Sequence, residues 1–246
     1  MKIVSNLTLV AALALSTQIS QANTCIGNCG ILGADGVVQV SPLGGDYEYV
    51  STNLGVTGVS PYNLGNETTG SKFTTSLFSA SAGSLLDFYF NYVTSDGSGF
   101  ADYGWASLLN GDGSEAALLF TARTQPSGNI IPGQGLPKPD AAIPTASIIP
   151  SGPAWSPLGS DSGRCFAAGC GYTGWVESIF TIATAGDYML EYGVVNWDDS
   201  DFQSGLAVDG ITVDGNLISP VPLPAALPLM FSALGALGFV RHKVKK

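Results

Sequence analysis

The sequence predicts an all-β protein, a β-sandwich or jelly roll, and three observations favour this class. Short segments rich in aromatic and β-branched residues follow one another, as strands do. Asp-Gly pairs at positions 35, 96, 112, 209 and 214 punctuate the chain, and each pair permits the positive φ of a tight turn. No window between the two chain ends carries the 3.6-residue apolar period of an amphipathic helix.

The expected strands follow in chain order. Leu85–Thr94 is apolar and aromatic on both faces, so we expect a central strand. The turn sequence Asn110-Gly-Asp-Gly-Ser114 lies between Phe100–Leu109 and Glu115–Thr124 and predicts a hairpin. The other segments expected to form strands are Lys72–Ala82, Trp175–Ala183, Tyr188–Trp197 and Gly205–Val213.

The segment Gln125–Pro157 breaks this pattern, with eight prolines and few strand signals. We expect either a long ordered loop or an inserted excursion, and connections of this length tend to be functional or mobile. Trp155 lies in this segment, where burial is least assured, and exposed rings beside acids and amides grip sugars. Trp155 is therefore the candidate ligand-binding residue. Trp105, Trp175 and Trp197 are expected to be core or platform residues, with the core as the commoner case.

The first 22 residues have the pattern of a secretory signal peptide. Lys2 precedes the apolar run Leu7–Leu15, and small or polar residues lead to Ala22, where we expect cleavage. The alternative, a short buried helix, lacks an amphipathic period. Residues 23–219 are then a single exported domain.

The last segment, 220–246, combines a proline motif, an apolar stretch and a basic end. The 20 residues from Val221 to Val240 carry no charge, and this is about the length needed to cross a bilayer. Prolines make the first third a poor helix, so we expect the hydrophobic helix to run from Ala225 or Pro228 to Val240, which is short for a span. The basic residues after it would stay in the cytoplasm. The simplest interpretation is a permanent C-terminal anchor. The motif residues are Val221, Pro222, Leu223 and Pro224, and the basic residues are Arg241, Lys243, Lys245 and Lys246.

The tail VPLPAALPLMFSALGALGFVRHKVKK resembles the VPLPA variant of the PEP-CTERM sorting signal. The resemblance implies recognition by an exosortase in the inner membrane, removal of the tail, and delivery to the cell surface or the exopolysaccharide matrix. Leu223 stands where the common form has Glu, and His242 lies in a cluster that is more often Arg-rich. The stretch Phe88–Val176 is also similar to the ectodomain of a PEP-CTERM group, which implies fold and location but no reaction. Tyr192–Gly215 is similar to the last strand pair of extracellular jelly-roll modules, many of which bind carbohydrate.

The expected exported part is strongly acidic. It contains all 19 acidic residues and only four basic ones (Lys72, Arg123, Lys138 and Arg164), a formal charge of −15. Such a charge keeps a protein soluble and away from anionic surfaces. It disfavours nucleic-acid binding, which needs clustered Lys and Arg.

All four cysteines lie in the exported part, and an even number in an oxidising compartment predicts disulfides. Of the three possible pairings we favour Cys25 with Cys29 and Cys165 with Cys170, each closing a small loop. The alternative is a zinc site made of the four thiolates, whose spacing is acceptable. Export argues against that alternative.

The chemistry open to the exported part is narrow. The one histidine, His242, lies in the tail, which removes Ser-His-Asp and Cys-His catalysis and histidine metal sites. Only carboxylates remain for catalysis, and a glycosidase needs a facing pair. Asp87, Asp102, Glu177 and Glu191 are the candidates, but nothing in the sequence pairs them, so we expect no enzyme.

Calcium is the one possible cofactor. Asp198, Asp199 and Asp201 place three acids within four residues, and carboxylate oxygens are calcium ligands. Asn110–Glu115 alternates oxygen-bearing residues with glycine in a similar way. A solvated acidic loop and a hairpin turn are the respective alternatives.

These observations lead to one expected function and two alternatives. We expect an exported surface or extracellular-matrix protein, sorted by an exosortase-like enzyme, structural or adhesive, with exopolysaccharide as a possible partner. The alternatives are a secreted carbohydrate-active hydrolase with two carboxylates and a permanently anchored envelope protein.

Overall fold

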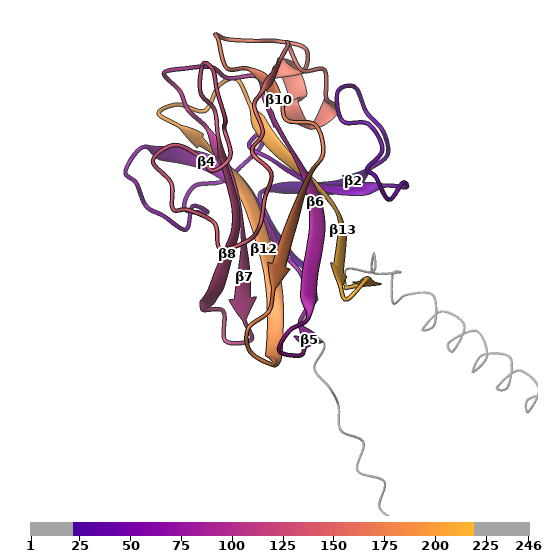
Figure 1. The fold of residues 1–246 in the computed structure, drawn as a ribbon. Coiled ribbons are helices and arrows are strands. Elements are labelled where there is room, and N and C mark those ends of the chain that lie inside the picture. Colours follow the sequence, from indigo (N-terminus) through magenta and orange to yellow (C-terminus); the bar gives the residue numbers. More distant parts are fainter. Residues whose placement is uncertain (1–21, 219–246) are drawn as a thin grey trace, which may run out of the picture.

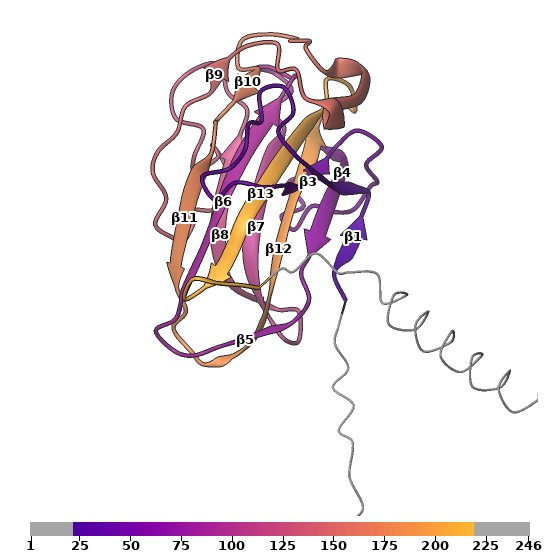
Figure 2. The same ribbon diagram turned by 90° about the vertical axis from the view of Figure 1, so that its right-hand side faces the viewer.

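The computed structural model describes residues 22–218 as two antiparallel sheets packed face to face (Figures 1 and 2). The expectation of an all-β fold is confirmed. The predicted sorting tail, and the predicted signal peptide apart from its last residue, lie outside the described residues.

The two sheets divide the strands as follows. The first sheet has the order β1-β4-β12-β7-β8, with β5 also paired to β12. Its bounds are β1 (Thr24–Ile26), β4 (Glu67–Thr74), β12 (Gly186–Trp197), β7 (Tyr103–Asn110), β8 (Glu115–Arg123) and β5 (Phe78–Ala80). The second sheet has the order β2-β3-β13-β6-β10-β9, with β11 also paired to β6 and β14 to β13. Its bounds are β2 (Asn28–Leu32), β3 (Tyr47–Ser51), β13 (Ser204–Val213), β6 (Leu85–Thr94), β10 (Gly171–Tyr172), β9 (Ile149–Pro150), β11 (Val176–Thr181) and β14 (Asn216–Leu217).

Most predicted strands are present. β6 has the predicted bounds, and β7 and β8 form the predicted hairpin around the Asn110–Ser114 turn. The predicted strand Lys72–Ala82 is instead two strands, β4 and β5, because the chain leaves the ladder between them. The short strands β1, β2 and β3 have no predicted counterpart.

The core lies between the sheets, and alternation along β6 decides which side chains enter it. The side chains at even positions of β6, which include Phe88 and Phe90, point inward. Phe90 stacks on Phe120 of the opposite sheet, with ring centroids 3.9 Å apart. The odd positions, Asp87 and Tyr89, therefore lie on the outer face of the second sheet. Both are half-buried.

Connecting segments cover part of each outer face. A cluster around Trp155 packs on the second sheet near the short helix η1 (Ser156–Asp161), at the end of the sandwich that holds β10 (Figure 1). A cluster around Trp105 lies on the first sheet. The long segment Gln125–Pro157 is ordered, since it buries Ile130 and Ile131 in the core. The outer face of β13 and β6 away from η1 carries a groove.

Candidate ligand-binding groove

The groove has a volume of about 660 Å³ and lies on the outer face of the second sheet. Its floor is formed by β13 and β6, and its walls by the loop before β3 and by the β13–β14 turn with β14. The walls are apolar and exposed: Leu43 is 58% and Leu217 68% accessible. Clefts with an apolar lining and a few convergent polar groups are the usual ligand sites of proteins.

A polar row crosses three adjacent strands beside this lining. Tyr89 of β6 pairs with Glu177 of β11 on one side and with Asp209 of β13 on the other. The Tyr89 hydroxyl donates a hydrogen bond of 2.9 Å to Glu177 Oε1, and this bond, followed by burial, raises the pKa of Tyr89. Asp209 accepts a hydrogen bond from the Ser41 hydroxyl. The row thus places one carboxylate on each side of a phenol ring.

Asp87, which lines the groove, has a carboxylate oxygen that accepts no hydrogen bond from the described residues. Its Oδ1 is buried and has no hydrogen-bond partner among residues 22–218. Burial, and then the charge of Glu177, raise the pKa of Asp87. A buried acceptor without a partner costs about 1–3 kcal/mol.

The structure brings together two of the four predicted carboxylates. Asp87 and Glu177 lie on neighbouring strands of the outer face. Asp102 is fully buried at the far end of the sandwich, where it accepts a hydrogen bond from the Ser204 hydroxyl. Glu191 lies on the first sheet and forms a 3.0 Å ion pair with Lys72.

The prediction that Trp155 presents an exposed ring is wrong. Its side chain is fully buried, because its indole Nε1–H donates to the Tyr47 hydroxyl at 2.9 Å and its ring packs on Tyr49. A Cβ atom at Gly205 would lie 2.5 Å from this ring, so the glycine makes room for it. Trp155 therefore anchors the η1 segment to the second sheet.

The other three tryptophans occupy different settings. Trp105 is fully buried on the outer face of the first sheet. Trp197 is half-buried beneath the Arg123 guanidinium, which lies 4.2 Å from its ring centroid. Trp175 is half-buried against Tyr47, with ring centroids 5.6 Å apart.

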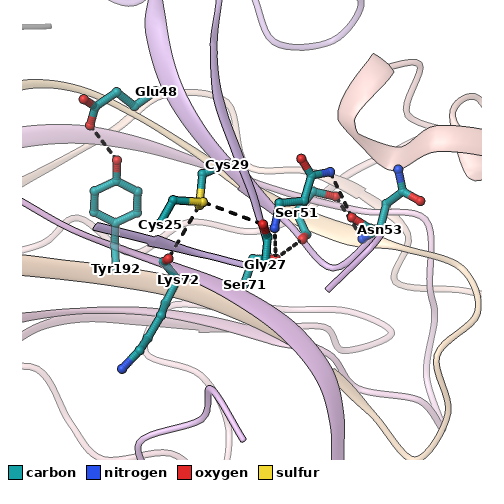
Figure 3. The surroundings of a disulfide bond; sticks show 10 residues. Cys25, Gly27, Cys29, Glu48, Ser51, Asn53, Ser71, Lys72 and Tyr192 are labelled. Carbon is teal, nitrogen blue, oxygen red and sulfur yellow. Dashed lines mark hydrogen bonds between the residues drawn. A yellow bond between two sulfur atoms is a disulfide. The ribbon is translucent and has the colours of Figure 1, made fainter. Parts of the chain in front are cut away.

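The four cysteines form the two favoured disulfides, Cys25–Cys29 and Cys165–Cys170, so the zinc alternative is wrong. The first disulfide lies where the chain passes from β1 in one sheet to β2 in the other (Figure 3). Beside it, the Asn28 backbone N–H donates to Ser71 Oγ at 2.8 Å, and this hydroxyl donates to the Ser51 carbonyl at 2.6 Å. The disulfide therefore lies at the junction of the two sheets.

The three acids of the predicted calcium loop do not converge. Asp198 accepts a 2.6 Å hydrogen bond from the Asn66 amide, whereas Asp199 accepts one from the Asp201 backbone N–H. No group of three or more His, Cys, Asp or Glu side chains in the described part of the chain is arranged to hold a metal. The Asn110–Glu115 stretch is a hairpin turn whose Asp112 accepts from Ser114.

Two residues of the polar row were not identified as site residues from the sequence. Tyr89 and Asp209 belong to strands that the sequence does reveal, and their outward position follows from alternation along β6 and β13. The wall residue Leu43 carries no signal, because only the fold brings its loop against β13.

The scan against family models finds no match for this sequence, and the search of curated proteins finds none either. Between residues 22 and 218, no helix has the length and apolar character needed to cross a membrane.

Proposed function

We propose that this protein is an exported surface or extracellular-matrix protein that binds a neutral polysaccharide in the groove of the second sheet. The observation that carries the proposal is the groove itself, in which Asp87, Tyr89 and Asp209 lie beside the exposed apolar side chains of Leu43 and Leu217. Sugars offer hydroxyl donors to carboxylates and C–H faces to aromatic and aliphatic side chains, and the groove provides both kinds of contact.

The strand order supports a jelly roll as the finer fold class. Counted along the chain, the eight main strands are β3, β4, β6, β7, β8, β11, β12 and β13. One sheet then has the order first-eighth-third-sixth, and the other the order second-seventh-fourth-fifth. This interleaving belongs to double-sheet jelly rolls, an architecture found in lectin domains.

The charge of the protein supports a neutral ligand. The residues between the two predicted end segments carry a formal charge of −15, and the groove itself contains Asp46, Asp87 and Asp209. An anionic polysaccharide would be repelled at the low ionic strength where charges act over long distances. Neutral glycans avoid this repulsion and use the carboxylates as acceptors.

Export and sorting are supported from two sides. Two disulfides are typical of an oxidising compartment. The VPLPA motif, the apolar stretch and the basic end follow in the order of a PEP-CTERM signal, which fits an exosortase-like enzyme as the processing partner. The tail would hold the chain in the inner membrane before processing.

Affinity electrophoresis of the mature protein tests the groove. Gels containing neutral glucans or mannans are expected to retard the wild type, whereas alginate or hyaluronate gels are not. Tyr89→Ala and Asp87→Asn are each expected to weaken retardation at least tenfold. Tyr89→Ala removes the aromatic ring that would contact the sugar, and Asp87→Asn removes the charge of a hydrogen-bond acceptor in the groove. Asp187→Asn, a surface carboxyl change outside the groove, serves as the matched control.

Unaltered retardation of both groove variants would contradict the proposal, and so would preferential binding to anionic glycans. Release of reducing sugar during the assay, abolished by Asp87→Asn, would instead favour the hydrolase. That second candidate rests on one observation, the raised pKa of Asp87 beside Glu177, since a glycosidase acid needs such a shift.

A further inference from the structure

Four acids lie on three segments at the β10 and η1 end of the sandwich. Asp96 follows β6, Asp161 ends η1, and Asp199 and Asp201 lie between β12 and β13. The end of β6 pairs with the start of β13 and with β10, which brings these connections to one end of the molecule. Asp161 is already paired, with Arg164 at 2.7 Å.

Asp96 is the acid of this end that lacks compensation. Its side chain is only 1% exposed; its Oδ1 accepts from the Gly97 backbone N–H at 2.7 Å, and its Oδ2 has no partner among the described residues. The neighbouring Ser95 backbone N–H donates to the Gln203 carbonyl at 3.1 Å, and the Gln203 backbone N–H donates to Asp161 Oδ2 at 3.3 Å. These contacts hold Asp161 and the loop before β13 next to Asp96, whose other charged neighbours are Asp199 and Asp201. Burial first, and then these charges, raise the pKa of Asp96 to about 7. An isolated buried carboxylate is costly unless a cation or a proton joins it.

The second disulfide loop covers Asp96. The Phe166 backbone N–H donates to the Ser95 carbonyl at 2.9 Å, and the Ser98 N–H donates to the Ala168 carbonyl at 2.8 Å. A Cβ atom on Gly97 would lie 2.6 Å from the Ala167 Cβ, so the two segments touch. The Cys165–Cys170 disulfide closes this loop and so helps to hold it in place over Asp96.

The surroundings of Asp96 are rich in oxygen atoms. Asp102 is fully buried, and its carboxylate accepts a hydrogen bond of 2.6 Å from the Ser204 hydroxyl. Burial, and then the charge of Asp96, raise the pKa of Asp102. Ser204 also lies 2.8 Å from Thr94 Oγ1, which accepts from the Asp96 backbone N–H. Carboxylate, hydroxyl and carbonyl oxygens are the ligands of calcium, which accepts six to eight of them in flexible geometry.

We propose that this end of the sandwich binds one divalent cation of the calcium type, with Asp96 as its buried ligand and Asp199 as the ligand from the acidic loop. Among the described residues, no three carboxylates are close enough together to hold a metal. Backbone carbonyls, hydroxyls or waters therefore supply the remaining ligands of the cation. This site differs from the one predicted from the sequence. Asp198 is not a ligand, because it accepts a hydrogen bond from the Asn66 amide, and Asp96 is a ligand that the sequence did not suggest. It is independent of the polysaccharide groove.

Thermal unfolding of the mature full chain tests the site with calcium alone. After treatment with EDTA, the melting temperature is measured at pH 7.5 and constant ionic strength from zero to 10 mM CaCl2. Sites of extracellular modules bind calcium with Kd of roughly 0.1–1 mM, which predicts an upward shift of about 3–10 °C. Asp96→Asn and Asp199→Asn are expected to lose most of this shift. Asp112→Asn, in the other acidic turn, is expected to keep it.

A second readout separates loss of binding from misfolding. Asp96→Asn removes an uncompensated buried charge, so without calcium this variant is expected to melt at or above the wild-type temperature. A wild type whose melting temperature is the same in EDTA and in 10 mM calcium would overturn the proposal. An equal shift in Asp96→Asn, or an equal shift with magnesium in place of calcium, would overturn it as well.

Discussion

At the scale of single residues, Glu67 links a surface loop to the first sheet. Its carboxylate accepts hydrogen bonds of 2.7 Å from the Leu64 and Gly65 backbone N–H groups, and one of 2.9 Å from the Tyr103 hydroxyl. Burial disfavours the ionised form, but these hydrogen bonds outweigh it and lower the pKa of Glu67 to about 2. The same loop carries Tyr62 onto the aromatic cluster around Trp105.

This pKa predicts the acid response of the protein. Because the folded pKa lies below the ordinary value of 4.5, the stabilisation by Glu67 is complete above pH 4.5 and is lost as the pH falls toward 2. Glu67→Gln is expected to lower the free energy of unfolding by about 1.5–3 kcal/mol at pH 7, the usual contribution of hydrogen bonds to a charged group.

Urea unfolding at pH 7, 4.5 and 3 measures this difference. The gap between wild type and Glu67→Gln is expected to shrink at pH 3. A gap that stays constant over this range would mean that the carboxylate charge contributes nothing to stability.

At the scale of elements, the first disulfide joins the edges of both sheets. β1 pairs with β4 in one sheet and β2 with β3 in the other, and only Gly27 separates β1 from β2. Gly27 has φ +86°, and a Cβ there would lie 2.3 Å from Ser71 Oγ, so the crossing requires glycine.

Replacing Cys25 and Cys29 together by Ser is expected to release the two short strands. A closed loop of about five residues stabilises by about 2 kcal/mol in the chain-entropy picture. Hydrogen exchange is expected to lose protection in residues 24–32 while β6 and β12 keep theirs. The matching Cys165→Ser, Cys170→Ser variant should leave residues 24–32 protected; faster exchange there in both variants would contradict a local role for the first disulfide.

Elements also set the limit of what the sequence reveals. β6 and the β7–β8 hairpin are predictable, because aromatic strands and an Asp-Gly turn have strong local signals. The strands β1, β2 and β3 are not, since each is short. In addition, β1 pairs with β4 and β3 with β13, which lie far along the chain, and β2 pairs only with β3. The disulfide pairing follows from small loop sizes.

The candidate site is less predictable than the fold. Asp87 and Glu177 are recognisable as carboxylates in strands, but their meeting depends on the pairing of β11 with β6. Trp155 misleads because a proline-rich segment suggests exposure, whereas the hydrogen bond to Tyr47 and the space above Gly205 bury its ring.

At the scale of the whole molecule, the proposed polysaccharide groove and the proposed calcium site lie in one acidic domain. The groove occupies the outer face of the second sheet, and the cation site lies toward the β10 end under the second disulfide loop. Both proposals need an oxidising exterior where millimolar calcium and polysaccharide are present. Export and sorting are therefore the premise on which the two binding proposals depend.

The intact mass of the protein recovered from its host's surface tests this premise most directly. The predicted mass lacks residues 1–22 and the apolar, basic part of the tail after the Val221–Pro224 motif, and it corresponds to two disulfides and no free thiol. A chain that keeps both end segments, with four reduced cysteines, would contradict export and sorting together.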